Sequence, residues 1–133
     1  MMQDDLKYWL ALKQIEGVGN VNFKALLDAV GSPQEVFRSP ASALRAIPGI
    51  GPKTAAQIKA FTGWENVEKE IERAGKLQIS IITCRDPSYP QDLLNIYDFP
   101  PLLYVQGSLE EDDINIAVVG SRLASSYGRF STE

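Results

Sequence analysis

The sequence predicts an all-α domain over residues 1–75, followed over residues 76–133 by the start of an α/β domain. Apolar residues recur at helical spacing in the first region, whereas short β-branched runs replace that period in the second. In this chain of 133 residues, the last nine, residues 125–133, are expected to form the beginning of a helix. Three strands and half a crossover helix would leave a sheet edge unpaired, so we expect this chain to be a fragment of a longer protein.

Short helices separated by turns are predicted for the first region. Two apolar stripes, around Leu12 and Leu26, indicate the first two helices. Proline at the first helical position predicts further helix starts at Pro33, Pro40 and Pro52. A last helix is predicted over residues 64–74, with the following glycine as its C-cap and its glutamates on a solvated face.

Three short runs in the second region are expected to form strands, at residues 78–84, 102–105 and 114–119. A short helix is expected between the first two, at residues 91–95. The mostly apolar character of the runs is typical of a buried, partly parallel sheet. Five side chains are expected in the core: Trp9, Phe61, Trp64, Cys84 and Tyr104.

The composition excludes several kinds of active site. The chain has no histidine, which removes histidine-assisted nucleophiles, imidazole metal ligands and histidine general bases. A single cysteine, Cys84, excludes an intramolecular disulfide and a cysteine-based zinc cluster. The N-terminus lacks the basic and apolar regions of a signal peptide, and no apolar stretch approaches a membrane span. We therefore expect a cytoplasmic binding protein rather than an enzyme.

The charge is unevenly distributed along the chain. The formal net charge is −4, which equals the charge of the acidic run at residues 110–113 alone. Residues 17–63 instead carry a net charge of +3, with five cations against Asp28 and Glu35. These cations are Lys24, Arg38, Arg45, Lys53 and Lys59. The overall acidity therefore does not argue against an anionic partner for the helical region.

An internal repeat organises the helical region. Residues 12–19 align with residues 44–51 at an offset of 32 residues, so that the apolar positions and both glycines coincide. An apolar helix is predicted after each copy. The pattern predicts a helix, a tight Gly-x-Gly hairpin and a second helix, twice over.

Such a hairpin is suited to binding phosphate. Glycine lets the backbone adopt positive φ and approach a ligand closely, and the N–H groups that open the next helix favour an anion. The second copy, with Lys53 and Thr54 after its turn, closely resembles the helix-hairpin-helix DNA-binding element of SAM-like domains. Its expected DNA contacts are Gly49, Ile50, Gly51, Lys53 and Thr54.

The first copy has Glu16 in place of the proline and no basic residue after its turn. Protein contacts or packing remain alternative roles for either hairpin.

A second candidate site follows the third predicted strand, at the turn Gly120-Ser121-Arg122. Anionic ligands bind outside the carboxyl ends of strands in open α/β sheets. The turn is not the dinucleotide fingerprint, because Arg122 stands where its second glycine is required. The planar fork of an arginine suits an exposed phosphate instead.

An ordered set of residues surrounds this turn and resembles the DNA-processing protein A (DprA/Smf) family. The set comprises Tyr89-Pro90, Leu93, Ile96, Pro100-Pro101, Leu103-Tyr104, Gly107, Ala117 to Arg122, Ser125 and Tyr127-Gly128. The resemblance covers nearly the whole chain, and it is strongest over residues 86–128.

The resemblance implies a Rossmann-like domain that forms a homodimer and binds single-stranded DNA. Such a protein is a recombination mediator, which protects incoming DNA and loads the RecA recombinase during natural transformation, with no metal, cofactor or catalysed reaction. Gly120, Ser121, Arg122 and Ser125 would hold the phosphates, with Arg122 as the main ligand. Tyr127 falls in the same motif and is equally suited to packing.

Two enzymatic alternatives are less well supported. A nucleotide-processing enzyme with a lysine-decarboxylase-like Rossmann domain needs a Pro-Gly-Gly-x-Gly-Thr loop and a catalytic glutamate, and neither occurs by residue 133. A helix-hairpin-helix glycosylase or nuclease needs a catalytic Asp or Lys shortly after the hairpin. Residues 55–64 offer only Lys59, with no acidic partner.

Overall fold

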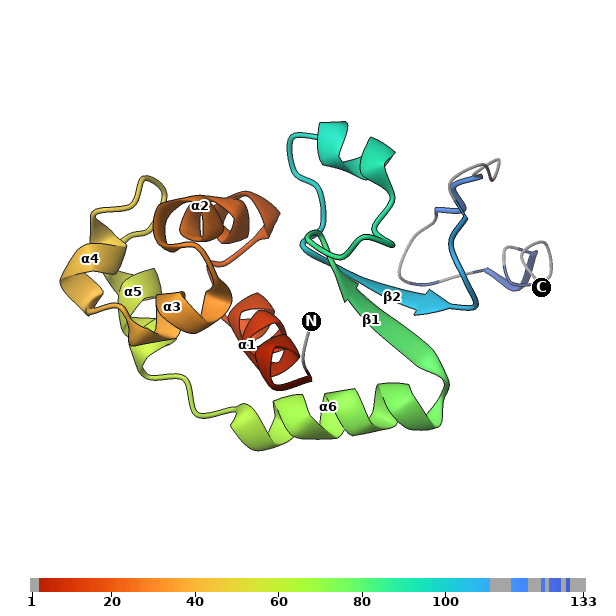
Figure 1. The fold of residues 1–133 in the computed structure, drawn as a ribbon, viewed down its shortest axis with the longest axis horizontal. Coiled ribbons are helices and arrows are strands. Elements are labelled where there is room, and N and C mark those ends of the chain that lie inside the picture. The colour runs from red at the N-terminus through yellow and green to blue at the C-terminus, as the bar shows by residue number, and fades with distance from the viewer. Residues whose placement is uncertain (1–2, 111–115, 120–122, 124, 128, 130–133) are drawn as a thin grey trace.

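The computed structural model describes residues 3–110, 116–119, 123, 125–127 and 129. Six α-helices are followed by a small two-stranded sheet, as Figure 1 shows. The helices are α1 (Gln3–Gln14), α2 (Asn20–Val30), α3 (Pro33–Arg38), α4 (Ala41–Arg45), α5 (Pro52–Lys59) and α6 (Trp64–Lys76). The strands are β1 (Ile79–Thr83) and β2 (Leu102–Gln106), with the 3-10 helix η1 (Gln91–Asn95) between them.

Most predicted helix starts are confirmed. Pro33 opens α3, where the Ser32 hydroxyl accepts a hydrogen bond from the Glu35 N–H at 3.3 Å, and Pro52 opens α5. Pro40 is instead the extended N-cap of α4, which begins one residue later than predicted. Because φ near −69° and ψ near 155° suit proline at either position, the sequence alone does not distinguish them.

The predicted end of the last helix is wrong by two residues. Gly75 lies inside α6, and Leu77 is the C-cap, with its N–H donating to the Arg73 carbonyl at 3.1 Å. The left-handed backbone that turns the chain into β1 falls on Gln78, with φ of 56°. A glycine near a helix end is therefore not its cap here, because the turn occurs three residues later.

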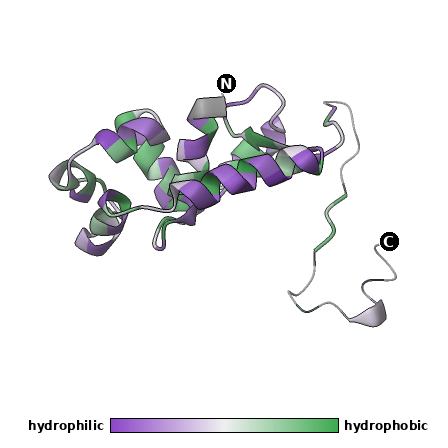
Figure 2. Cartoon of the chain, turned by 90° about the horizontal axis from the view of Figure 1, so that it is seen from below, coloured by the Kyte–Doolittle hydropathy of each residue, from purple (hydrophilic) through white to green (hydrophobic). Residues whose placement is uncertain are grey.

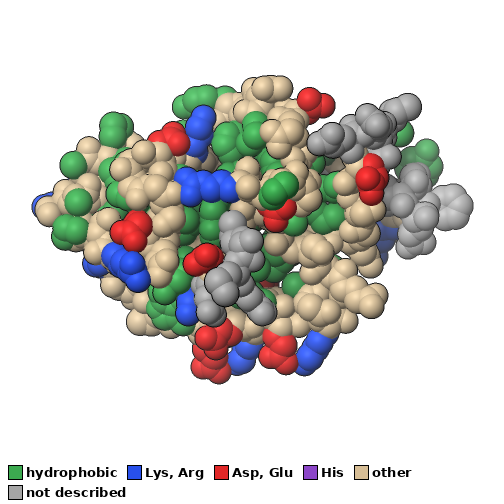
Figure 3. All heavy atoms as spheres, in the orientation of Figure 1, with side chains coloured by type: hydrophobic (Ala, Val, Ile, Leu, Met, Phe, Trp, Pro, Cys, Tyr) green, Lys and Arg blue, Asp and Glu red, His purple; other side chains and the backbone are tan. Residues whose placement is uncertain are grey.

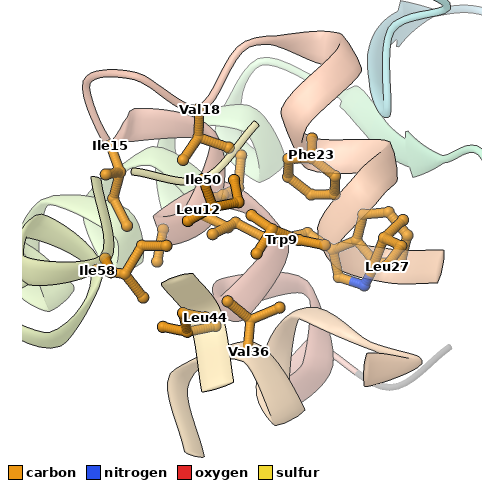
Figure 4. Close-up of a cluster of buried hydrophobic side chains, with 14 of the residues drawn as sticks. Trp9, Leu12, Ile15, Val18, Phe23, Leu27, Val36, Leu44, Ile50 and Ile58 are labelled. Atoms are coloured by element: carbon orange, nitrogen blue, oxygen red, sulfur yellow. The ribbon is translucent and has the colours of Figure 1, made fainter. Parts of the chain in front are cut away.

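Both copies of the repeat contribute side chains to one hydrophobic core. Figure 4 shows Leu12 and Val18 from the first copy beside Leu44 and Ile50 from the second. Trp9 is 3% exposed and stacks on the ring of Phe23 at 5.5 Å, which confirms its predicted place in the core. The paired copies thus bury a shared interior that neither could enclose alone.

Helix α6 connects the helical region to the sheet. It packs against both α1 and β1, and Figure 2 shows a mainly hydrophilic outer face along it. Leu102, at the start of β2, joins the core cluster of the helices. The Tyr104 hydroxyl on β2 donates a hydrogen bond to a Glu70 carboxylate oxygen on α6 at 2.9 Å.

The predicted sheet differs from the observed one. Strands β1 and β2 pair antiparallel, with Ile81 opposite Tyr104. Residues 116–119 of the third predicted strand are not a strand, and Ile116 and Val119 are 84% and 91% exposed; residues 114–115 lie outside the described residues. A parallel strand needs cover on both faces, and no described element packs on this run. The partly parallel sheet is therefore a wrong prediction, and the Rossmann-like arrangement is not confirmed.

Aromatic residues differ in how well they match their predicted places. Phe61 and Trp64 are half-buried, and the Trp64 ring lies 5.1–5.5 Å from those of Tyr8, Phe37 and Phe61. Tyr104 is 53% exposed rather than buried, because it points outward from β2 toward α6. These rings join elements that are distant in sequence.

The contact between Tyr104 and Glu70 predicts a pH effect on stability. Burial, the hydrogen bond to Glu70 and the negative charge of that carboxylate raise the pKa of Tyr104 from 10 to about 12. In the unfolded chain the phenol ionises near its usual pKa, so its contribution is complete below pH 10 and is lost as pH rises toward 12. We expect Tyr104→Phe to reduce the loss of unfolding free energy over this interval, measured by urea denaturation.

The Glu70→Gln variant provides the matched control, because it keeps a hydrogen-bond acceptor and removes the charge. It should reduce the same loss only in part. A pH dependence that is identical in the wild type and in Tyr104→Phe would contradict this assignment.

Candidate nucleic-acid interface

The two hairpins of the repeat have the same backbone geometry. Gly17 and Gly49 both adopt φ of +90°, a conformation that L side chains rarely take. The second glycines, Gly19 and Gly51, both have φ of −83° with extended ψ, and they are the N-caps of α2 and α5. The predicted repeat of helix, hairpin and helix is therefore confirmed.

The apolar residue between the two glycines anchors each hairpin. Val18 and Ile50 are both 4% exposed. Their N–H groups donate to the carbonyls of Ile15 at 3.1 Å and Ile47 at 3.0 Å, respectively. Among the predicted DNA contacts, Ile50 is therefore engaged inside the protein through both its side chain and its N–H.

The hairpins also interlock with each other. A Cβ atom on Gly17 would lie 2.7 Å from the Thr54 hydroxyl of the second hairpin, and one on Gly49 would lie 2.7 Å from the Asn22 side-chain oxygen of the first. Asn22 and Thr54 are equivalent positions in the repeat, so the contact is reciprocal. The predicted ligand Thr54 is half-buried in this interlock.

The tip of the second hairpin is open to solvent. Gly49, Gly51, Pro52 and Lys53 are all exposed. Helix α5 has neither a side-chain cap nor an acidic residue in its first turn. The first N–H groups of a helix and its dipole both favour an anion, and Lys53 adds a positive charge at the same place.

The first hairpin is partly covered by another part of the chain. The Asn20 side-chain amide, at the start of α2, donates to the Asp98 carbonyl at 3.0 Å and accepts from the Lys13 ammonium at 2.6 Å. The Lys24 ammonium lies 5.3 Å from the centre of the Phe99 ring. The segment between η1 and β2 therefore lies against α2, as can be followed in Figure 1.

Two of the predicted cations serve the fold. Arg38 pairs with Glu35 at 3.2 Å, one turn away on α3. The Lys59 ammonium donates to the carbonyls of Phe37 at 2.8 Å and Ser39 at 2.9 Å, at the end of the same helix. In Figure 3 the cations are scattered over this face and form no continuous basic patch, and acidic and basic side chains alternate along the lower edge, where α6 lies. The local charge of +3 therefore overstates what the hairpins present to a ligand.

Sequence reasoning missed a cation at the first hairpin. Lys13 lies in the last turn of α1 just before that hairpin, at the position equivalent to Arg45 in the second copy, and both side chains are exposed. The net charge of +3 was summed over residues 17–63, and this range does not include Lys13. The alignment of the two copies contained the signal, because it places Lys13 opposite Arg45.

The second predicted site falls largely outside the structure. Gly120, Ser121 and Arg122 lie outside the described residues, whereas Ser125 is described and exposed. A hollow of about 690 Å³ lies between the segment around Tyr89 and residues 109–110. The acidic residues Asp92 and Glu110 line it, and its described lining holds no lysine or arginine, so it does not suit a phosphate.

The described residues also limit other chemistry. They contain no group of three or more His, Cys, Asp or Glu side chains placed to hold a metal ion. Cys84 is half-buried, and burial raises the pKa of its thiol, which disfavours the reactive thiolate. None of the helices in this part of the chain is long and apolar enough to span a membrane.

Each of the two regions matches the model of a known protein family. Residues 10–74 match the family model of the SAM-like helix-hairpin-helix tandem, so the helical region is a domain of that class. Residues 80–133 match the family model described as DNA recombination-mediator protein A. Together the two matches, in this order, confirm the resemblance to the DNA-processing protein A (DprA/Smf) family.

A curated relative agrees with this assignment. Protein Smf of Synechocystis sp. (strain ATCC 27184 / PCC 6803 / Kazusa) is 28% identical over 133 residues. The alignment covers 96% of this chain and 33% of the relative. The chain thus spans about a third of the length of the curated relative it matches.

The contact between the hairpins predicts that a methyl group added at either hairpin glycine lowers the stability of the fold. Gly17→Ala and Gly49→Ala should each lower the free energy of unfolding by about 1–3 kcal/mol, because each introduces both a strained φ and a contact of 2.7 Å. Urea denaturation of the purified chain measures this change.

Two glycines serve as controls. Gly31 has φ of +98° with nothing within 4 Å, so Gly31→Ala reports the backbone cost alone. Gly75 lies within α6 in open space, and Gly75→Ala should stabilise by about 0.5–1 kcal/mol. Equal losses at Gly17 and Gly31 would show that the interlock contributes nothing.

Proposed function

We propose that this chain binds single-stranded DNA through its second hairpin, as part of a recombination mediator. The observation that carries the proposal is the exposed, uncapped start of α5, with Lys53 in its first turn and Gly49 at φ of +90°. Arg45 precedes the same hairpin and is also exposed. Backbone donors and Lys53 lie together at the start of α5, and Arg45 precedes the turn, which is an arrangement suited to a backbone phosphate.

The phosphate contacts at this hairpin are few, so the affinity is modest and sensitive to salt. A second contact at Gly120, Ser121, Arg122 and Ser125 would add to it, with Arg122 as the main ligand. The match of residues 80–133 to a recombination-mediator family supports this second contact. The two sites together would hold a strand more firmly than either could alone.

The remaining parts of the proposal concern the activity of the whole protein. We propose that the whole protein protects incoming DNA and loads RecA during natural transformation. It would act in the cytoplasm as a homodimer, without a cofactor and without catalysing a reaction. The matching family is one of DNA recombination mediators, which supports this role over an enzymatic one. The relative named Smf supports the same family.

Binding of a fluorescent single-stranded oligonucleotide across a salt series tests the hairpin. Lys53→Ala should weaken binding several-fold at low salt and reduce the slope of log K against log[salt] by about 0.7, the share of one phosphate. Lys69→Ala on α6 is the matched control, because it changes the net charge equally and removes only an exposed pair with Glu65.

Two outcomes would overturn parts of the proposal. If Lys53→Ala binds with the affinity and slope of the wild type, the second hairpin holds no phosphate. Arg122→Ala in the same series tests the other turn, and unchanged affinity there would refute its assigned phosphate role.

A further inference from the structure

An exposed tyrosine lies on the segment that covers the first hairpin. Tyr97, between η1 and β2, is 79% exposed. Single exposed aromatic residues are common on protein surfaces, so exposure alone carries no function. The way this residue is held and the place where it is held distinguish it from the others.

The segment on the C-terminal side of Tyr97 is held by contacts at three successive residues, two through backbone carbonyls and one through a side chain. The Asp98 carbonyl accepts a hydrogen bond from the Asn20 amide at 3.0 Å, and the Phe99 ring lies under the Lys24 ammonium. The Pro100 carbonyl accepts a hydrogen bond at 2.7 Å from the hydroxyl of Tyr89, which is itself only 1% exposed. The ring is therefore presented by a segment that loses little conformational freedom when a ligand binds.

The contacts of Asp98 and Phe99 hold the segment next to Tyr97 against α2, the helix that follows the first hairpin. Asn20 and Lys24 lie within the first five residues of α2, and Asn20 is bonded to the exposed Lys13. At the position equivalent to Lys53, the first hairpin has Val21 and so offers no cation there. The first hairpin thus differs from the second in that a segment bearing an exposed aromatic residue is held against the helix that follows it.

We propose that Tyr97 stacks on an unpaired base of the DNA strand whose phosphates the second hairpin holds. The inference rests on the proposed function and adds a base contact to it. An aromatic ring stacks on a base of any sequence, while cations elsewhere on the same surface hold the backbone. Bases in a duplex are already stacked on one another, so the contact selects single strands.

Three ligands and two variants test this contact by fluorescence anisotropy on the 133-residue chain. The ligands are a single-stranded oligonucleotide, the same strand with abasic sites throughout, and its duplex; the intact single strand is also measured at several salt concentrations. Tyr97→Ala should weaken binding to the intact single strand roughly tenfold, the scale of one base stack. It should leave the salt slope unchanged, because no phosphate contact is lost.

The control variant and the abasic strand separate stacking from a structural effect. Tyr97→Phe keeps the ring and should bind like the wild type. Tyr97→Ala should bind the abasic strand and the duplex as the wild type does. An equal loss on all ligands would overturn the stacking contact in favour of a structural role, and so would a Tyr97→Ala variant with unchanged affinity.

The same series distinguishes this inference from the proposed function. If Lys53→Ala weakens binding and Tyr97→Ala does not, the hairpin site stands and the stacking contact fails. If the wild-type chain binds no single-stranded DNA, both fail together.

Discussion

The reciprocal contact between the two hairpins determines much of the helical domain. Because Gly17 and Gly49 lack a Cβ atom, Thr54 and Asn22 can approach to positions that a methyl group would occupy. This close approach brings the two copies together, so that Val18 and its equivalent Ile50 enter one core. The positive φ of the same two glycines turns the chain tightly into the next helix at each hairpin. Packing and the presentation of the hairpin tips therefore depend on the same two glycines.

Symmetric backbones do not lead to symmetric surfaces here. The second hairpin leaves Pro52 and Lys53 exposed at the start of α5, whereas Asn20 at the start of α2 is bonded to the Asp98 carbonyl. The difference lies in side chains and in a segment 78 residues further along the chain. The repeat thus supplies two equivalent scaffolds, and long-range packing assigns them different surroundings.

Local signals in the sequence predicted the features that depend on local physics. Gly-x-Gly spacing predicted both hairpins, because a positive φ is set within one turn, and proline predicted the starts of α3 and α5. Features that depend on distant partners could not be predicted in this way. Lys59 was counted as a free cation, but it bonds to carbonyls about 20 residues away. Residues 116–119 were expected to form a strand because they are apolar, yet strand formation requires a neighbour, and the described part of the chain provides none.

The distribution of charge explains why the proposed phosphate site at one hairpin would be weak by itself. The chain carries a net charge of −4, and ion pairing or carbonyl contacts already occupy Arg38 and Lys59. Attraction from the whole molecule is therefore small, and a strand must be held by short-range contacts. Contacts of this kind gain strength when several act on one flexible ligand, because the second binds at high effective concentration once the first is made. A modest hairpin joined to further contacts on the same chain could hold a strand and still release it, as the proposed mediator role requires.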